Sequence, residues 1–366
     1  MRCSISSNSV SAPRADRGPS PPPARGPIWQ PLLGVAVSIG FLVWALWGVK
    51  FADVLQQMRH ANPLWYLLSC AAAFLTFPVR AIRWRIMLRS STSERRFQPY
   101  WRAVCIGFMA NNVLPARAGE VVRSYAGTEL IGVPFTTALA SVAVERVFDG
   151  VVLVLLLALA VVLPGFPAGA TLKSTSISAL AATMAVVFVG ALVFLIILVR
   201  NRDRALPIAE RLIRKVTPAR LGPLVIRILE NLVAGLGVLQ SLRDISLVIL
   251  WSFAVWLANA LSYLLAFHAF GVDVPAGAAL LLPSIVAFGV AVPSSPGFFG
   301  VFEEISKLVL GKYGIAGTTA ITFAIGIHLG WFIPITIIGL VLLARSGLSL
   351  HSLRTGARVA QATPAP

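Results

Sequence analysis

Long uninterrupted runs of apolar residues are the feature of this sequence that most restricts its fold. A helix needs about 20 apolar residues to cross the hydrocarbon layer of a membrane, and several runs of the 366-residue chain reach that length. They are residues 28–49, 63–82, 138–163, 177–199, 245–270 and 315–344. Because hydrocarbon offers backbone groups no hydrogen-bonding partners, each run must be helical. The sequence therefore predicts an all-α polytopic membrane protein with six full spans.

Two further apolar runs are too short or too broken to be ordinary spans. Residues 103–115 and 276–293 end at Pro, with Gly close by, so we expect re-entrant segments that enter the membrane and turn back. Full crossing by either or both would give the alternative of seven or eight spans. Two similar hexapeptides, Leu-Pro-Ala-Arg-Ala-Gly at 114–119 and Val-Pro-Ser-Ser-Pro-Gly at 292–297, follow these runs. Such a pair is compatible with an inverted repeat and also with chance.

Basic residues are concentrated in the loops and indicate the orientation. Seven Lys and Arg lie between positions 80 and 102 and nine between 200 and 243, whereas the loops at 50–62 and 164–176 hold two and one. The positive-inside rule then places both termini in the cytosol. In a soluble domain, 31 Lys and Arg against 14 Asp and Glu would suggest nucleic acid as a partner. Here the basic residues flank apolar runs, so we expect contact with anionic membrane lipids and no nucleic-acid partner.

The remaining segments are polar or amphipathic. Residues 1–27 and 346–366 are poor in large apolar side chains and are predicted to be disordered tails, the first of them cytosolic. Within 204–243, apolar side chains recur at helical spacing, which predicts an amphipathic helix on the membrane surface or against the protein's own cytosolic face. Three Cys and four His show no spacing typical of disulfide frameworks or metal sites, and we expect neither metal nor cofactor.

Ionisable residues near hydrocarbon are the candidates for function. Their charges have a high free energy there unless they are paired, so unpaired ones usually serve a function. At the end of the second span, Arg80, Arg83 and Trp84 share one helical face, and the two guanidinium groups can hold a lipid phosphate. They can equally mark the cytosolic end of a span and extend to the headgroups.

A second cluster surrounds a Pro and Gly break. It contains Asn111, Pro115, Arg117, Gly119, Glu120 and Arg123. Glu120 and Arg123 are three residues apart, so we expect them to neutralise each other and to leave Arg117 as the more available cation. Broken helices expose helix ends to a polar cavity. The plainer alternative is a simple loop with a salt bridge.

The third span carries a third cluster in its first turns, Glu145, Arg146 and Asp149. Arg146 and Asp149 can pair along the helix, whereas Glu145 and Asp149 share a face and repel each other unless a cation lies between them. We expect Arg80, Arg83 or Arg117 to be that cation. The alternative is a cluster that neutralises itself and has only a structural role.

A fourth cluster is a turn rich in Gly and Pro that ends in a carboxylate. It contains Pro293, Pro296, Gly297, Gly300 and Glu303. Such a turn can bring backbone N–H groups and the carboxylate of Glu303 to the membrane. An ordinary interfacial loop with aromatic anchors is the alternative.

Together the four clusters resemble the transmembrane flippase-like region of lysylphosphatidylglycerol synthases, over residues 28–345. The motifs that carry the likeness are Arg-x-x-Arg-Trp at 80–84, Asn-x-x-x-Pro-x-Arg-x-Gly-Glu-x-x-Arg at 111–123, Glu-Arg-x-x-Asp at 145–149 and Pro-Gly-x-x-Gly-x-x-Glu at 296–303. The resemblance implies a bacterial cytoplasmic membrane protein that moves phospholipid or polyprenyl-linked lipid along a path lined by the motif residues. The chain looks like a stand-alone member without the aminoacyl-transferase domain, so we expect no aminoacyl transfer.

Three classes of function remain open. In a lipid flippase, the arginines attract an anionic headgroup and the carboxylates balance charge within a polar groove. A polytopic transferase acting on lipid-linked substrates would use Glu145, Asp149 or Glu303 as an acid or base, although the sequence has no P-loop and no Gly-x-Ser-x-Gly elbow. A lipid-binding membrane regulator would depend on the basic cytosolic loops. The sequence does not indicate the oligomeric state.

Overall fold

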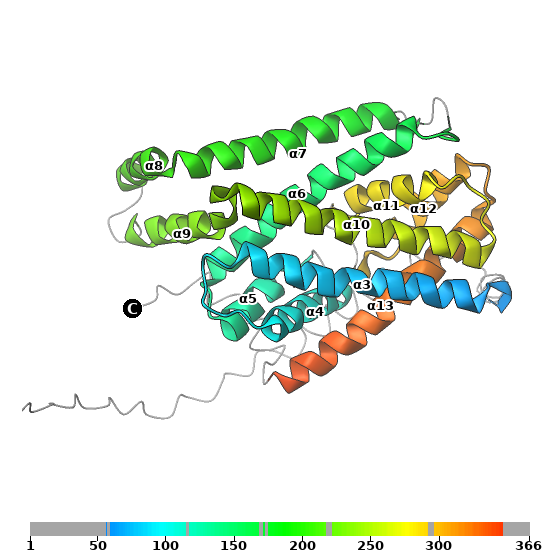
Figure 1. Cartoon of the computed structure of the whole chain (residues 1–366), viewed down its shortest axis with the longest axis horizontal. Coiled ribbons are helices and arrows are strands. Elements are labelled where there is room, and N and C mark those ends of the chain that lie inside the picture. The colour runs from blue at the N-terminus through cyan, green and yellow to red at the C-terminus, as the bar shows by residue number, and fades with distance from the viewer. Residues whose placement is uncertain are drawn as a thin grey trace, which may run out of the picture.

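The protein is a bundle of long helices packed around one central helix (Figure 1). The computed structural model describes residues 56, 59–114, 117–167, 171–172, 175–216, 222–291 and 296–346. The predicted tail at 1–27, the predicted span at 28–49, Pro115, Pro293 and all but the first residue of the tail at 346–366 lie outside the described residues.

The described helices keep the labels of Figure 1. They are α3 (Pro63–Met87), α4 (Phe97–Val113), α5 (Gly119–Ile131), α6 (Phe135–Val162), α7 (Ile177–Arg200), α8 (Arg202–Val216), α9 (Gly222–Gly235), α10 (Leu242–Phe270), α11 (Ala278–Gly289), α12 (Val301–Gly311) and α13 (Gly317–Arg345), with short 3-10 turns η1 (Gly237–Gln240) and η2 (Pro296–Phe298). Two antiparallel strands of two residues each, β1 (Thr171–Leu172) and β2 (Thr175–Ser176), precede α7.

Five of the six predicted spans fall within the described residues, and each is a helix of 24 to 29 residues. Four of them, α3, α7, α10 and α13, are long and apolar enough to cross a membrane. The exception is α6, because every 18-residue stretch of it contains the three charges at positions 145, 146 and 149. The all-α membrane architecture is confirmed, and the total of six spans stays a prediction.

The runs predicted to be re-entrant, 103–115 and 276–293, form the short helices α4 and α11, and each is followed by a second short helix, α5 or α12, that was not part of the prediction. Helices α4 and α5 have 17 and 13 residues, and α11 and α12 have 12 and 11. Each is shorter than the roughly 20 residues that a crossing requires. The two pairs lie toward opposite ends of the bundle (Figure 1). Their lengths and positions support re-entrant segments that open on opposite sides.

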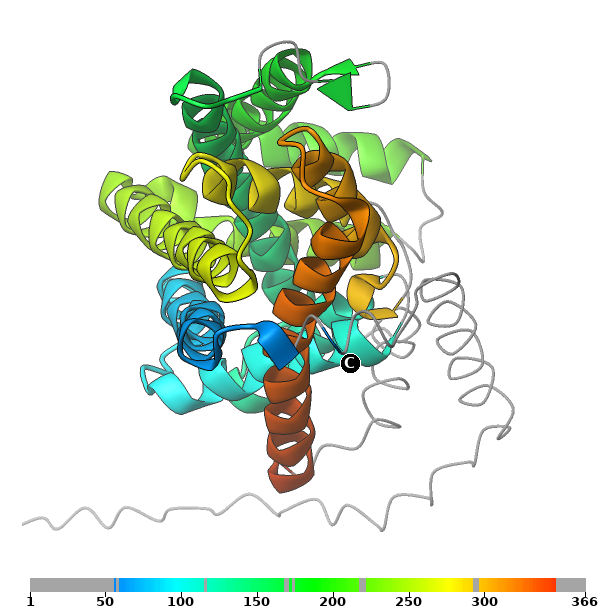
Figure 2. The same ribbon diagram turned by 90° about the vertical axis from the view of Figure 1, so that its right-hand side faces the viewer.

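The order of helices in the first half recurs in the second. A long helix, two short helices and a long helix form α3 to α6, and the same series forms α10 to α13. Helices α3 and α10 lie side by side (Figure 2) and antiparallel, because the N–H of Asn62 donates to the carbonyl of Ala269 (2.8 Å) at one end and Arg89 pairs with Asp244 at the other. This arrangement is that of an inverted repeat.

The turns near the two hexapeptides share one feature of backbone conformation. Within the described residues, Arg117 (φ 55°) and Phe298 (φ 65°) are the non-glycine residues with positive φ. Each is followed two positions later by a glycine at the start of a helix, Gly119 for α5 and Gly300 for α12. Arg117 and Phe298 thus occupy similar positions in the two turns, and the correspondence of the two hexapeptides stays a prediction.

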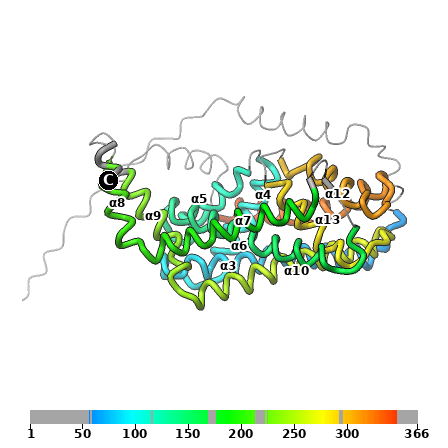
Figure 3. Tube along the Cα trace, turned by 90° about the horizontal axis from the view of Figure 1, so that it is seen from above, coloured from blue at the N-terminus to red at the C-terminus, as the bar shows by residue number. Residues whose placement is uncertain are grey.

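Helix α6 is the centre of the bundle. It packs against α3, α5, α7, α9, α10 and α11, and Figure 3 shows it beneath α7 and between the two halves. Two apolar cores lie on either side of its charged turn, one around Trp84 and Phe148 and the other around Leu157 and Phe323. Helix α7 lies at the outer edge, where Val186 is 76% exposed, as expected for a side chain that faces lipid.

The amphipathic region at 204–243 differs from its prediction as a single helix. Helix α8 ends at Val216 and α9 begins at Gly222. Helix α9 packs on α6, where the hydroxyl of Thr137 donates to the carbonyl of Asn231 (3.0 Å). This contact favours the second of the two predicted settings, a helix packed on the protein itself, for α9.

Candidate functional site

Two carboxylates of α6 lie at the centre of the bundle with an arginine between them. Glu145 and Asp149 are 0% and 3% exposed. The fully buried Arg83 of α3 reaches both, with Nη2 2.9 Å from Oε1 of Glu145 and Nη1 bonded to Asp149. Its Nη1 also donates to the hydroxyl of Ser252 (2.7 Å). Arg83 is therefore the cation that relieves the repulsion between the two carboxylates.

Glu145 receives a second arginine from α5. Both terminal nitrogens of Arg123 donate to Glu145, at 3.0 and 2.8 Å, in a two-pronged ion pair. The guanidinium also lies 4.2 Å from the ring centre of Trp84, whose indole N–H donates to Ser141 (2.9 Å). The predicted pair of Glu120 with Arg123 is wrong, because Arg123 pairs with Glu145 of α6, whereas Glu120 lies near Arg117 and Arg146.

Asp149 also collects donors from both halves of the repeat. Arg80 of α3 reaches its Oδ2 at 3.5 Å, and the indole N–H of Trp256 of α10 donates to its Oδ1 at 3.0 Å. The guanidinium of Arg80 lies 5.3 Å from the ring centre of Phe108 and 5.4 Å from that of Trp256. Trp256 and Ser252 were not predicted as site residues. Their spacing of four residues on one face of α10 is the signal that identifies them.

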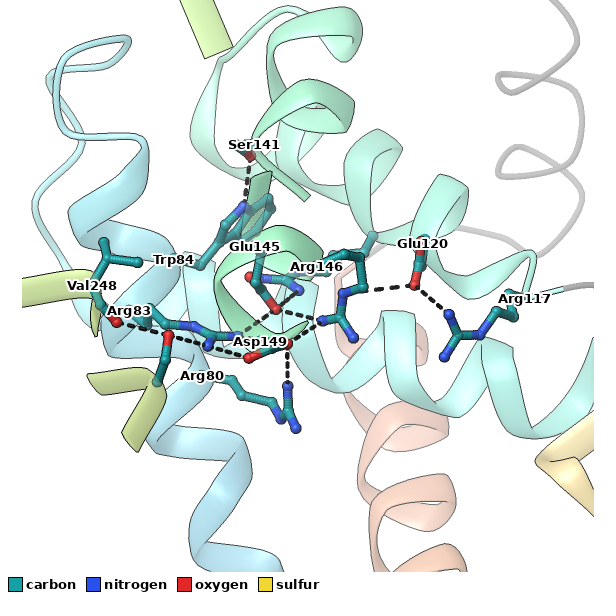
Figure 4. A network of polar contacts seen from close by, with 12 residues as sticks. Arg80, Arg83, Trp84, Arg117, Glu120, Ser141, Glu145, Arg146, Asp149 and Val248 are labelled. Atoms are coloured by element: carbon teal, nitrogen blue, oxygen red, sulfur yellow. Dashed lines mark hydrogen bonds and ion pairs between the residues drawn. The ribbon is translucent and has the colours of Figure 1, made fainter. Parts of the chain in front are cut away.

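A chain of alternating charges leads from this centre to the edge of the cavity (Figure 4). Arg146 lies 2.8 Å from Glu145 and 3.3 Å from Asp149, which confirms the predicted pair along α6. It also approaches Glu120 at 3.9 Å, and Glu120 lies 3.7 Å from Arg117. The two contacts of Glu120 are longer than the two inner contacts of Arg146, so Arg117 and Glu120 are the most loosely held charges of the series.

These side chains line a cavity of about 250 Å³. Its polar wall contains Arg80, Asn111, Arg117, Glu120, Arg123, Arg146 and Asp149. Its apolar wall is larger and includes Phe77, Phe108, Leu153, Phe188, Trp256, Val286, Phe288, Phe298 and Phe302. One compartment thus combines concentrated positive charge with an extensive aromatic and aliphatic surface.

The break between α4 and α5 is stabilised by Asn111 and Gly119. The side-chain oxygen of Asn111 accepts the N–H of Gly119 (2.8 Å), which caps the first turn of α5. A Cβ at position 119 would collide with the carbonyl oxygen of Gly107 and lie 2.5 Å from that of the Asn111 side chain. Glycine is therefore needed for α5 to approach α4. The N-terminal end of α5, where the helix dipole is positive, faces the cavity.

The turn that precedes α12 is held by a buried histidine. Glu303 accepts the N–H of Gly300 (2.7 Å) with one oxygen and lies 2.7 Å from Nδ1 of His328 with the other. Nε2 of His328 lies 2.8 Å from the carbonyl of Gly297, an acceptor, so this nitrogen carries a proton. Pro296 is buried beside this network, and Gly297 and Gly300 have positive φ.

His328 was not among the predicted site residues, since the four histidines of the sequence show no spacing typical of metal ligands. It lies within the 29-residue apolar helix α13 and is 0% exposed. Phe299 and Trp331 stack against its ring, with centres 4.4 and 5.1 Å away. An ionisable residue in the middle of an apolar run is itself the signal that identifies it.

The turns of the two short-helix pairs meet at the cavity. The guanidinium of Arg117, from the first turn, lies 5.7 Å from the ring centre of Phe298, from the second. Both residues have positive φ and both line the cavity. The structure therefore brings three predicted clusters, those around Arg83, Arg117 and Glu145, directly together. The fourth cluster borders them through Phe298 and Phe302, which line the cavity. Glu303 does not line it and instead accepts a hydrogen bond from Gly300 within its own turn.

The sequence of the chain matches a known family. The family described as the lysylphosphatidylglycerol synthase TM region matches residues 32–339, which is well over half of the chain and contains all four clusters. The protein belongs to this family. The resemblance inferred from the four motifs is confirmed, and the protein is a multi-pass membrane protein.

Relatives of this lysylphosphatidylglycerol synthase TM-region protein carry different names. Glycosyltransferase AglD of Haloferax volcanii is 27% identical over 279 residues, which cover 69% of this chain and 44% of AglD. A UPF0104 membrane protein of Methanothermobacter thermautotrophicus is 25% identical over 276 residues, 72% of this chain and 78% of that protein. Another from the same organism is 30% identical over 132 residues, 36% and 37% of the two chains. The match thus spans less than half the length of AglD.

Proposed function

We propose that this protein binds the headgroup of an anionic lipid in its arginine-lined cavity and passes the lipid between the leaflets of the cytoplasmic membrane. The lipid is a phospholipid or a polyprenyl-linked lipid. The observation that carries the proposal is the cavity itself. In it, three arginines and two carboxylates of α3, α5 and α6 face a large apolar wall. A lipid has the same division between a charged head and an apolar chain.

The charges are arranged to replace water around a headgroup. A phosphate in hydrocarbon lacks hydration, and arginines supply the fixed donors that partly offset this loss. Arg80 and Arg146 both approach Oδ2 of Asp149, so their guanidinium groups converge on one point. Arg117 lies at the outer end of the charge series and has 23% of its side chain accessible, against 31% for Arg146 and 8% for Arg80. We infer that Arg117 meets the headgroup first and that the inner arginines then hold it.

The inverted arrangement of the short helices supports passage rather than binding alone. The turns that meet at Arg117 and Phe298 belong to helix pairs lying toward opposite ends of the bundle. Movement of one pair would open the cavity toward one leaflet, and movement of the other would open it toward the second leaflet. On the count of Lys and Arg in the loops, we place both termini in the cytosol, and the family resemblance favours a bacterial membrane.

Substitution of Arg117 tests this function. Arg117→Gln is expected to slow lipid transfer about tenfold, equivalent to about 1.4 kcal/mol in the barrier, because it removes the outermost cation while leaving the buried ion pairs in place. The measurement is dithionite quenching of fluorescent phosphatidylglycerol and phosphatidic acid in proteoliposomes of the purified full chain.

The matched control is Arg96→Gln. Arg96 is also basic, but its side chain is 82% exposed and pairs with Glu94 outside the cavity. This variant is expected to transfer lipid at the wild-type rate. Equal rates for Arg117→Gln and the wild type, with both folded, would contradict the proposed role of the cavity.

A transferase is the second candidate, because AglD is named a glycosyltransferase. The carboxylates available for such chemistry differ in how closely arginines enclose them. Glu145 and Asp149 are enclosed by arginines, whereas 29% of the Glu120 side chain is exposed at the cavity edge. We therefore rank transfer of a sugar below transfer of a lipid. Formation of a glycosylated product by the purified protein would reverse this order, and lipid binding without movement would favour a regulator.

A further inference from the structure

The walls of the cavity carry more positive than negative charge. The charged side chains of the cavity and their direct partners are Arg80, Arg83, Arg117, Arg123 and Arg146 against Glu120, Glu145 and Asp149. Five cations and three anions leave an excess of two positive charges among the described residues. Glu303 and His328 share one proton and add no net charge whichever of them holds it. The undescribed positions of the two turns, 115–116 and 292–295, contain no ionisable side chain.

The excess is located at Arg80 and Arg146. Arg123 uses both terminal nitrogens on Glu145, and Arg83 is enclosed by Glu145, Asp149 and a serine hydroxyl. These two arginines balance the two buried carboxylates. Arg117 is matched by its neighbour in the first turn of α5, the carboxylate at position 120.

Arg80 and Arg146 therefore share carboxylates that are already neutralised. Both approach the same oxygen, Oδ2 of Asp149, at 3.5 and 3.3 Å, and Figure 4 shows them converging on it from different sides. Arg80 is only 7% exposed and lies between two aromatic rings. The Nε atoms of both arginines have no hydrogen-bond partner, as is true of the other three arginines of the cluster. Arg146 also contacts Glu145 at 2.8 Å and Glu120 at 3.9 Å. Both guanidinium groups thus share all their carboxylate partners with other arginines, and neither has a carboxylate of its own.

An uncompensated charge has a high free energy in a medium of low polarity, and each counter-charge that is supplied lowers this free energy. The headgroup of phosphatidylglycerol is a phosphate diester with one negative charge. A phosphate monoester loses its second proton near pH 6 and carries close to two negative charges at pH 8, and a diphosphate carries at least two. We propose that the cavity selects lipids whose headgroup bears two negative charges, a phosphate monoester or a diphosphate, over lipids with a single phosphate diester. This inference rests on the proposed lipid binding and names its substrate class.

Binding at equilibrium tests the inference without depending on transport. Phosphatidic acid and phosphatidylglycerol with identical acyl chains would compete for the purified full chain in detergent, with bound lipid counted by native mass spectrometry at pH 8. Phosphatidic acid is expected to bind at least about tenfold more tightly. The preference should fall as the pH is lowered through the range in which the monoester takes up its second proton, about pH 6.

Two substitutions move the charge excess in opposite directions. Arg80→Gln lowers it to one and is expected to reduce the preference for phosphatidic acid at least fivefold. Glu120→Gln raises it to three and should increase the preference. Because the Glu120 side chain is partly exposed, we expect this variant to fold. Arg96→Gln should leave the preference unchanged. Opposite shifts in two variants identify charge, rather than shape, as the cause.

Each outcome bears on a different claim. Equal binding of the two lipids, with ratios unaffected by both substitutions, would overturn the charge selectivity while leaving lipid transport in place. Inorganic phosphate or diphosphate that displaces phosphatidic acid at equal concentration would assign the site to a soluble anion and overturn selection of a lipid. Absence of binding by either lipid, together with absent transfer in proteoliposomes, would overturn the proposed function itself.

Discussion

Replacement of Glu145 by Gln is expected to lower the free energy of unfolding by about 3–5 kcal/mol, the range for breaking a buried ion pair by removing one partner. Glu145 is fully buried and contacts Arg83, Arg123 and Arg146 at 2.8 to 2.9 Å. Glutamine keeps the size of the side chain but raises the charge excess of the cluster from two to three. Chemical unfolding in detergent micelles, followed by tryptophan fluorescence, measures the change.

The matched control for this prediction is Glu304→Gln. The side chain of Glu304 is 60% exposed and its contact with Lys307 is 4.0 Å, so its loss should change stability by less than about 0.5 kcal/mol. The double variant Glu145→Gln with Arg123→Gln returns the excess to two and should recover part of the lost stability. A single variant that loses less than about 1 kcal/mol would show that solvent or lipid already screens this cluster.

Replacement of Gly119 by Ala is expected to destabilise the protein by about 1–3 kcal/mol, the usual range for adding a methyl group to a packed site, and to abolish lipid transfer. The added Cβ would meet the carbonyl oxygen of Gly107, which is backbone and cannot rotate away. Helix α5 must then move from α4 and carry Glu120 and Arg123 with it. Thermal unfolding and transfer in proteoliposomes would be measured on the same preparation.

Gly190→Ala is the control, because it makes the same substitution in a helix where nothing lies within 4 Å of the added atom. Alanine is the better helix former by about 1 kcal/mol, so this variant should be as stable as the wild type or more so. Normal transfer by Gly119→Ala would mean that the spacing of α4 and α5 does not position the cavity arginines.

The sequence predicted the long helices well because one physical constraint dominates them. Backbone groups cannot be left without partners in hydrocarbon, so a long apolar run must be a helix. Helix α7, predicted at 177–199 and found at Ile177–Arg200, follows its apolar run closely. The same rule describes α6 less directly, because its three charges interrupt the apolar run and only their burial by neighbouring helices makes the segment compatible with the membrane.

Pairing within the site was predicted less well, since helical spacing reports only neighbours on one helix. Spacing predicted Arg146 with Asp149 correctly, but paired Arg123 with Glu120 where the structure pairs it with Glu145. Spacing also left open which arginine lies between the two carboxylates of α6. The answer, Arg83, depends on how α3 packs against α6 and α10.

What the sequence determined by itself is the membrane class of the fold, the positions of its long apolar helices and the residue types available for binding an anion. These follow from local rules, because hydropathy and the Pro and Gly breaks act over a few turns of chain. Only the tertiary structure decided that Trp256 and Ser252 of the second half complete the site of the first and that His328 holds the turn before α12. It also decided that two positive charges remain unmatched in the cavity. These results depend on contacts between helices far apart in the chain, which the packing of an inverted repeat creates and no local pattern encodes.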